Sequence, residues 1–229
     1  MNVAICVPIA AKKPSEISAL IKKAEVMGAN FAEIRLDYLE DFNGIEKAIE
    51  DARIPLIATN RQYEQGGAYK QNENERLKRL LETASKGFSF VDIEITTPKI
   101  KLVVENLKKK SVETIVSFHD FNKTPSLQEL RKIAASQIRV KADICKIVTK
   151  ANDIGDNLTC LSLVSETSRK IRTVCFAMGK HGIFSRVLSP LFGGYFTYAS
   201  LKIGMETAPG QISIEQLKKI YKLLGVEEF

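Results

Sequence analysis

Eight short apolar runs alternate with helix-like patterns along the chain, and this alternation constrains the fold more than any other feature. Apolar runs of about four to eight residues are typical of buried strands, and apolar residues at every third or fourth place are typical of helices. Strands are expected at Val3–Ile9, Phe31–Leu36, Ile54–Asn60, Phe90–Ile95, Thr114–Phe118, Ala142–Val148, Arg172–Met178 and Gly194–Tyr198. Helices are expected at Pro14–Met27, Ile45–Asp51, Glu73–Ser85, Pro98–Lys109, Ser126–Ser136, Asp153–Ser168, His181–Leu188 and Ile214–Leu224. These units predict an α/β protein with a (β/α)8 TIM barrel.

No linker divides the chain. A Pro/Gly-rich tract, a low-complexity stretch or a shift of composition would mark a boundary, and none occurs, so we expect one domain over residues 1–229. The main rival fold is a doubly wound sheet, which most often carries a glycine-rich phosphate turn after its first strand. Here that place reads Pro8-Ile9-Ala10-Ala11-Lys12. A nucleotide-binding fold is therefore disfavoured.

The charge balance favours a small anionic ligand over a nucleic acid. The chain carries 34 Lys and Arg against 27 Asp and Glu, which gives a net charge of +7. The lysine groups fall in or beside expected helices, where they form solvated faces, and the chain has no Trp to alternate with them. We therefore expect no nucleic-acid partner, and attraction of anionic small molecules explains the charge better.

Cysteine usage and the first residues predict a cytoplasmic protein. Cys6, Cys145, Cys160 and Cys175 are widely spaced and form no CxxC pair, which is typical of small buried residues in a reducing compartment. The opening residues lack the positive segment of a signal peptide. No apolar stretch approaches membrane-spanning length, so we expect no membrane partner.

One lysine interrupts the expected sixth strand, Ala142–Val148. Period-2 alternation puts Lys146 on the face of Ile144 and Val148, where apolar side chains belong. Burial disfavours the charged form of an amine, and an uncharged lysine is the nucleophile that forms a Schiff base with a carbonyl. The alternative is a lysine that reaches solvent from a strand end or pairs with a carboxylate.

Polar residues gather where the expected strands end, and in a barrel the chemistry lies at the carboxyl ends of the strands. In Glu33-Ile34-Arg35-Leu36-Asp37 the three charges share one face, and the third strand ends Thr59-Asn60-Arg61. The fourth strand holds Asp92-Ile93-Glu94, again with both charges on one face. One such strand is consistent with an exposed edge that carries surface ion pairs. Three in successive units indicate a polar barrel mouth.

The later units add a histidine, an arginine and a loop. His119 ends the fifth strand, where a neutral imidazole can transfer protons near pH 7; alternatively it is a structural residue with its hydrogen bonds satisfied. Asp120 either orients it or caps a turn. Arg186 follows the seventh strand and either binds a carboxylate or forms a surface ion pair. The run from Thr207 to Gln211 follows the eighth strand and is either a mobile lid or an ordinary turn.

Taken together, these segments resemble type I 3-dehydroquinate dehydratases of the shikimate pathway. The resemblance covers nearly the whole chain, and the order and spacing of the motifs are more specific than any one motif. It rests on Glu33-Ile34-Arg35-Leu36-Asp37, Arg61 before Gly66-Gly67, Asp92-Ile93-Glu94, Ser117-Phe118-His119-Asp120-Phe121, Lys146, Ser185-Arg186 and Ala208-Pro209-Gly210-Gln211. It implies a (β/α)8 barrel, usually a homodimer, that converts 3-dehydroquinate to 3-dehydroshikimate through a lysine imine without metal or cofactor.

The resemblance also implies a role for each matched residue. Lys146 would form the imine, and His119 would give and take protons. The substrate would be held by Glu33, Arg35, Arg61, Arg186, Thr207 and Gln211, with Arg186 on its carboxylate. Thr207 stands where the family usually has serine. Gln65 stands where a glutamate commonly supports the histidine, so either Glu64 takes that place or the histidine is tuned differently.

The implied chemistry leads us to expect oily and cationic surroundings for Lys146, since nearby arginines disfavour a charged amine and hold an anionic substrate. Two other functions stay open. Another imine-forming barrel enzyme, such as a class I aldolase-like lyase, would keep Lys146 but does not need the substrate-holding residues together. The chain is alternatively an inactive barrel that binds an anionic metabolite or assembles with other proteins.

Overall fold

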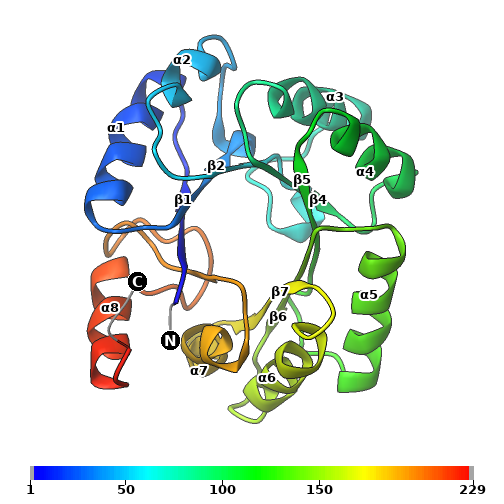
Figure 1. Ribbon diagram of the computed structural model, residues 1–229, viewed down its shortest axis with the longest axis vertical. Helices are drawn as coiled ribbons and strands as arrows, with labels where there is room; N and C mark the ends of the chain where they lie inside the picture. Colours follow the sequence, from blue (N-terminus) through cyan, green and yellow to red (C-terminus); the bar gives the residue numbers. More distant parts are fainter. Residues whose placement is uncertain (1–2, 227–229) are drawn as a thin grey trace.

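The protein is a (β/α)8 TIM barrel, as the alternation predicted. The computed structural model describes residues 3–226, and its helices form a ring around the strands (Figure 1). Neighbouring strands are parallel, in the order β7-β6-β5-β4-β3-β2-β1-β8. The strands are β1 (Ile5–Ile9), β2 (Phe31–Arg35), β3 (Leu56–Thr59), β4 (Phe90–Glu94), β5 (Glu113–His119), β6 (Ile144–Lys150), β7 (Arg172–Met178) and β8 (Thr197–Tyr198).

A helix follows each strand along the chain. The helices are α1 (Pro14–Val26), α2 (Ile45–Ile49), α3 (Glu73–Ala84), α4 (Ile100–Lys109), α5 (Leu127–Arg139), α6 (Asp156–Thr167), α7 (Ile183–Leu188) and α8 (Ile214–Leu223). Their starts carry local signals, since Pro14 opens α1 and capping boxes open α5 and α8 at Ser126 and Ser213. Within residues 3–226, no helix has both the length and the apolar character to cross a membrane.

The eighth unit departs most from the expected bounds. β8 has two residues, Thr197–Tyr198, where the sequence predicted a strand from Gly194 onward. It pairs with β1 through Cys6 and Tyr198, and its other edge shares no ladder with β7 in the described chain. A hydrogen bond from the Tyr195 amide to the Thr173 carbonyl, 2.8 Å long, links the two sides. The barrel is therefore nearly closed, with its loosest seam between β7 and β8.

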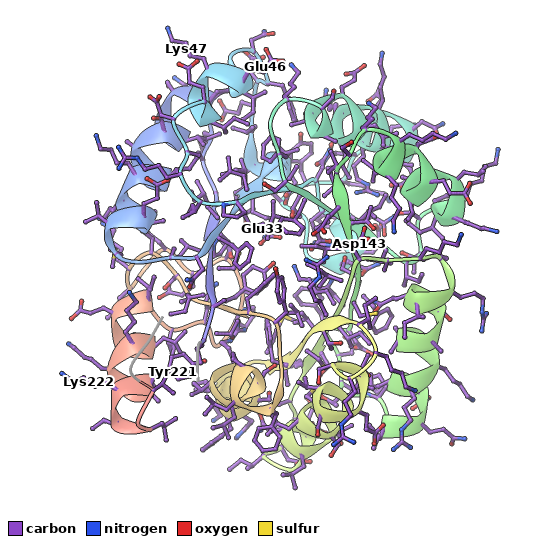
Figure 2. The ribbon with its side chains drawn as sticks, in the orientation of Figure 1. Glu33, Glu46, Lys47, Asp143, Tyr221 and Lys222 are labelled. Carbon is purple, nitrogen blue, oxygen red and sulfur yellow. The ribbon has the colours of Figure 1, made fainter. Side chains whose placement is uncertain are left out.

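Strand alternation sorts side chains between the barrel interior and the helix layer. Ile34 and Leu36 pack in the apolar layer between strands and helices, whereas Glu33 and Arg35 point into the barrel. Figure 2 shows Glu33 near the middle of the molecule, while Lys47 on α2 lies at its outer edge. The predicted face assignment for the second strand is therefore confirmed.

Aromatic side chains fill the end of the barrel interior where the strands begin. The ring of Phe31 lies 5.9 Å from that of Phe90 and 5.1 Å from that of Phe196, measured between centroids. Ile57 and Ile115 belong to the same buried cluster. Polar interior residues occur two places further along the same strands. The interior is thus an apolar plug where the strands begin and a polar mouth where they end.

Candidate active site

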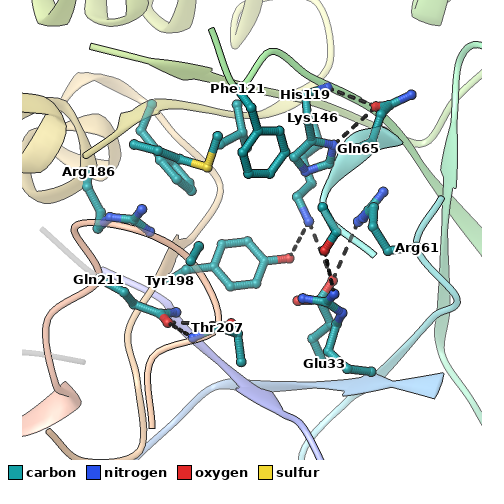
Figure 3. A pocket seen from close by; sticks show the side chains of 16 residues that line it. Glu33, Arg61, Gln65, His119, Phe121, Lys146, Arg186, Tyr198, Thr207 and Gln211 are labelled. Atoms are coloured by element: carbon teal, nitrogen blue, oxygen red, sulfur yellow. Dashed lines mark hydrogen bonds and ion pairs between the residues drawn. The ribbon is translucent and has the colours of Figure 1, made fainter. Parts of the chain in front are cut away.

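All eight site residues predicted from the sequence line one pocket at the carboxyl ends of the strands (Figure 3). They are Glu33, Arg35, Arg61, His119, Lys146, Arg186, Thr207 and Gln211. Much of the remaining wall is apolar, with Phe121, Val148, Phe176, Met178 and Ala208 among its members. Most of the lining residues are nevertheless polar or charged, and such a set of convergent polar groups suits a small, polar and charged ligand.

Lys146 points into the barrel and is almost fully buried, with 3% of its surface exposed. Its Nζ lies 2.7 Å from Asp92 Oδ2 and 3.5 Å from Glu33 Oε1, and it donates to the Tyr198 hydroxyl at 2.9 Å. It therefore does not reach solvent. The alternative of a lysine paired with a carboxylate is the one that the structure shows. The expectation of oily and cationic surroundings was incomplete, because two carboxylates also contact the amine.

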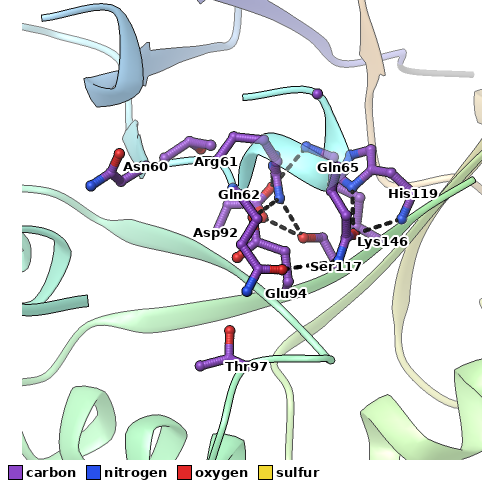
Figure 4. A network of polar contacts seen from close by, with 12 residues as sticks. Asn60, Arg61, Gln62, Gln65, Asp92, Glu94, Thr97, Ser117, His119 and Lys146 are labelled. Atoms are coloured by element: carbon purple, nitrogen blue, oxygen red, sulfur yellow. Dashed lines mark hydrogen bonds and ion pairs between the residues drawn. The ribbon is translucent and has the colours of Figure 1, made fainter. Parts of the chain in front are cut away.

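Asp92 links Lys146 to a buried network of alternating charges (Figure 4). Arg61 contacts Asp92 at 2.8 Å and Glu94 at 2.9 Å, and Arg76 contacts the second oxygen of Glu94 at 3.1 Å. Burial alone would raise the pKa of Asp92, but Arg61 and Lys146 outweigh it and hold that pKa well below its usual range. Asp92 is therefore an anion that fixes the position of the lysine.

Arg35 is fixed by a bidentate ion pair. Its Nε and Nη2 donate to the two oxygens of Asp37 at 2.9 and 2.6 Å, and Nη2 also donates to the Gly66 carbonyl at 3.1 Å. Gly66 has φ of +88°, and a Cβ there would lie 2.4 Å from the Phe121 ring. The close approach of this loop to the pocket therefore requires glycine.

Gln65, and not Glu64, supports His119. The Gln65 Oε1 accepts the backbone N–H of His119 at 2.9 Å and lies 3.3 Å from its Nδ1, while Glu64 is exposed to solvent. Because an amide oxygen only accepts, Nδ1 must carry the proton to bond with it. This leaves Nε2 unprotonated and able to accept. Asp120 caps a turn by accepting the Asn122 amide at 2.8 Å, which settles the alternative in favour of the cap.

Further hydrogen bonds fix the orientation of the Gln65 amide. Its Nε2 donates to Thr96 Oγ1 at 2.8 Å and to Gln62 Oε1 at 3.3 Å. Loss of water on burial lowers the pKa of His119 well below its usual value, and the positive charges of Arg61 and Lys146 lower it further. His119 is therefore a neutral imidazole near pH 7, with its proton on the nitrogen that faces Gln65.

Arg186 is the contrasting cation of the pocket. Its side chain is 1% exposed, yet within residues 3–226 it forms no ion pair and its Nε has no hydrogen-bond partner. Its Nη2 donates to the Pro209 carbonyl at 3.4 Å, and the guanidinium lies 4.4 Å from the centre of the Phe176 ring. Burial lowers its pKa to about 10. A buried arginine without a carboxylate partner is a ready receptor for an anionic group.

The loop from Thr207 to Gln211 packs onto the pocket rim. Gln211 Oε1 accepts the Thr207 amide at 2.8 Å, and the Gly179 amide donates to the Pro209 carbonyl at 3.1 Å. Gly210 has φ of +72°, and a Cβ there would lie 2.3 Å from the Gly179 carbonyl oxygen. The loop is thus tied to the end of β7 in this conformation. Its opening and closing stays a prediction.

Tyr198 and the contact of Asp92 with Lys146 were missed by sequence reasoning. The strand around Tyr198 was treated only as an apolar run, although its alternation puts Phe196 and Tyr198 on one face. That alternation, with a polar tip at the carboxyl end, was the available signal. The contact between Asp92 and Lys146 had no such signal, because these residues lie on different strands.

Comparisons with known proteins agree on one family. The sequence model of the type I 3-dehydroquinase family matches residues 5–228. The chain is 41% identical over 202 residues to a 3-dehydroquinate dehydratase of Dehalococcoides mccartyi, with 88% of each chain covered. It is 36% identical over 230 residues to that of Methanothermobacter thermautotrophicus, with both covered completely. A type I 3-dehydroquinate dehydratase structure from Clostridium difficile has a TM-score of 0.87 at 26% identity and covers 100% of this chain and 94% of that one.

The pairing difference between two buried arginines predicts opposite effects on stability. Arg186→Met should leave the free energy of unfolding unchanged or raise it, because it removes a buried charge that has no ion-pair partner among residues 3–226. Arg76→Met, the matched control, should lower it by about 3–5 kcal/mol, because Glu94 and Glu73 lose a buried cation. Urea denaturation at pH 7.5, in a buffer without multivalent anions, measures both. If Arg186→Met lowered the free energy of unfolding as much as Arg76→Met, this would contradict the description of Arg186 as an arginine without an ion-pair partner.

The neutral state of His119 predicts a pH dependence of stability. Its pKa is lower in the folded than in the unfolded protein, so the unfolded chain takes up a proton first as the pH falls through about 6.5. Neutral His119 therefore contributes fully to the free energy of unfolding above that pH. This contribution is lost on acidification, by at most about 1.4 kcal/mol per pH unit. Between pH 7.5 and 5.5, the free energy of unfolding measured by denaturation should therefore fall less steeply in His119→Asn than in the wild type. Equal slopes would show that His119 does not titrate in this way.

Proposed function

The chain belongs to the type I 3-dehydroquinase family, and from this premise we propose that it dehydrates 3-dehydroquinate to 3-dehydroshikimate through an imine on Lys146. The reaction is that of a hydro-lyase in the shikimate pathway. The observation that carries the proposal is the meeting of a buried amine, a neutral imidazole and an unpaired guanidinium in one pocket. Each of these groups has a separate task in the reaction.

Substrate binding begins at Arg186. Its unpartnered Nε and its neighbouring N–H groups suit the carboxylate of the substrate, which can accept two parallel hydrogen bonds. The other polar groups of the wall are directed at the ring hydroxyls and the ketone; they are Glu33, Arg35, Arg61, Thr207 and Gln211. Because these groups are held by bonds to the protein, little reorganisation is needed when the substrate arrives.

Lys146 is paired with Asp92 in its charged form, so the covalent step starts when Nζ gives a proton to the unprotonated Nε2 of His119 and frees its lone pair. The neutral Nζ adds to the ketone carbon, and the carbonyl oxygen leaves as water with the proton that His119 returns. The resulting iminium acts as an electron sink that acidifies the adjacent C–H. The unprotonated Nε2 of His119 accepts that proton, and the C–H electron pair enters the conjugated system. His119 then returns the proton to the hydroxyl that leaves the next carbon, which forms the new double bond. Water hydrolyses the imine and restores Lys146.

The alternative functions have less support. A class I aldolase-like lyase would use Lys146 but does not account for the unpaired Arg186 together with the ring-hydroxyl partners. An inactive binder does not account for a histidine held in one tautomer beside a buried amine. Appearance of a conjugated enone by ultraviolet absorbance separates the dehydratase from both. The homodimer, the single functional domain over residues 1–229, the cytoplasmic location and the lack of a metal or cofactor stay predictions.

Borohydride trapping tests the proposed roles of Lys146 and His119. Wild-type protein incubated with 3-dehydroquinate and borohydride should gain the mass of one reduced adduct, and Lys146→Ala should gain none. His119→Ala should form the adduct slowly and turn over at least about 100-fold more slowly, because it lacks the proton acceptor. Lys150→Ala, which removes an exposed lysine from the same strand, is the control and should match the wild type. An adduct on Lys146→Ala would sink the proposed mechanism.

The assignment of Arg186 predicts a defect in affinity. Arg186→Met should raise KM for 3-dehydroquinate about 100-fold, because two hydrogen bonds to a charged carboxylate are lost, at roughly 1.5 kcal/mol each. Arg131→Met, in which an exposed arginine loses its pairing with Glu166, should leave KM unchanged. Steady-state enone formation measures both variants. A change in kcat at constant KM would assign Arg186 to the chemical step instead.

A further inference from the structure

Tyr198 lies closer to the reactive nitrogen than the proposed function requires. Its hydroxyl is 2.9 Å from the Lys146 Nζ, its ring centre is 4.5 Å from that atom, and its side chain is almost fully buried in the pocket wall (Figure 3). It reaches this place from the end of β8, where it pairs with Cys6 of β1. A hydroxyl this close to Nζ also lies close to any carbon that Nζ attacks.

The Tyr198 hydroxyl keeps its proton in this site. Burial raises the pKa of Tyr198, and the negative charges of Glu33 and Asp92 raise it further. The hydroxyl already accepts a hydrogen bond from Nζ, so its own proton points away from the lysine. The Cys6 thiol is a neighbour of this hydroxyl, and sulfur is a weak acceptor. The proton is thus available to a stronger acceptor that enters the pocket.

Imine formation needs a proton donor at this position. When Nζ adds to a ketone, the nitrogen becomes positive and the former carbonyl oxygen becomes negative, and a proton must move from one to the other. Asp92 cannot donate this proton, because Arg61, 2.8 Å away, holds it in its anionic form. Tyr198 contacts Nζ and carries a proton, so it can take a proton from the nitrogen and give one to the oxygen.

We propose that Tyr198 is a catalytic residue that relays a proton from the Lys146 Nζ to the ketone oxygen during imine formation, an inference that rests on the proposed function. The hydroxyl gives its proton to the oxygen of the adduct, and the phenolic oxygen takes one from the positive Nζ. The product is a neutral carbinolamine, and Tyr198 is unchanged. In the second transfer the hydroxyl protonates the same oxygen again, which leaves as water while the nitrogen lone pair forms the C=N bond. The tyrosinate then regains a proton from His119, which took it from the Lys146 ammonium before the attack, so Tyr198 is again a phenol and His119 is again a base before the C–H step.

The test compares two tyrosines that lie three residues apart. Tyr198→Phe removes only the hydroxyl and keeps the ring against Lys146. Tyr195→Phe makes the same change at a residue whose hydroxyl accepts from Arg172 at 3.4 Å, outside the catalytic pocket. Each protein is mixed with saturating 3-dehydroquinate, quenched at set times into borohydride and weighed. We expect the rate of adduct formation to fall about 100-fold in Tyr198→Phe, at the low end of what a positioned acid–base group contributes, and to stay unchanged in Tyr195→Phe.

Each outcome separates this inference from the function on which it rests. Adduct formation by Tyr198→Phe within about threefold of the wild-type rate overturns the relay, while the proposed function stands. A raised KM with a wild-type rate at saturation also overturns it, because Tyr198 would then only bind the substrate. Failure of the wild type to form any adduct refutes the proposed function and the relay together. Thermal unfolding of both variants near the wild-type temperature is the control for folding.

Discussion

The contact between Asp92 and Lys146 is the interaction on which the site depends. It joins the reactive amine to a buried series of alternating charges, which runs through Glu73, Arg76, Glu94, Arg61, Asp92 and Lys146. Buried charges are costly unless each is paired, and removal of one partner leaves the next uncompensated. The series therefore acts as a unit. Because it spans several strands, it places Nζ with the precision of the sheet rather than of a loop.

The arginines of this pocket are of two kinds, those that are paired with a carboxylate of the protein and one that is not. Arg61 and Arg35 are paired with carboxylates of the protein, so they hold neighbouring groups and set the local field in addition to lining the pocket. Arg186 is as deeply buried but has no acid beside it within the described residues. An incoming carboxylate can supply the missing charge. The burial of Arg186 without an ion-pair partner thus raises the free energy of the ligand-free protein, and a matching ligand removes this cost.

The sequence predicted the face on which each side chain lies better than the neighbours it would meet. Period-2 alternation correctly put Lys146 and Glu33 inside the barrel, because that pattern depends only on local backbone geometry. The contacts of Lys146 with Asp92 and Tyr198 depend on strand register around the barrel, which local patterns do not contain. The support of His119 by Gln65 depends on a loop conformation and was left between two residues for the same reason.

The aromatic plug formed by Phe31, Phe90 and Phe196 has a consequence for traffic through the enzyme. Because these rings pack the far end of the barrel, a ligand reaches the pocket from the carboxyl ends of the strands. Each cycle of the proposed reaction releases two water molecules and consumes one. These waters use the same end of the barrel as the substrate and the product. The product therefore has to leave by the same end of the barrel at which the next substrate arrives.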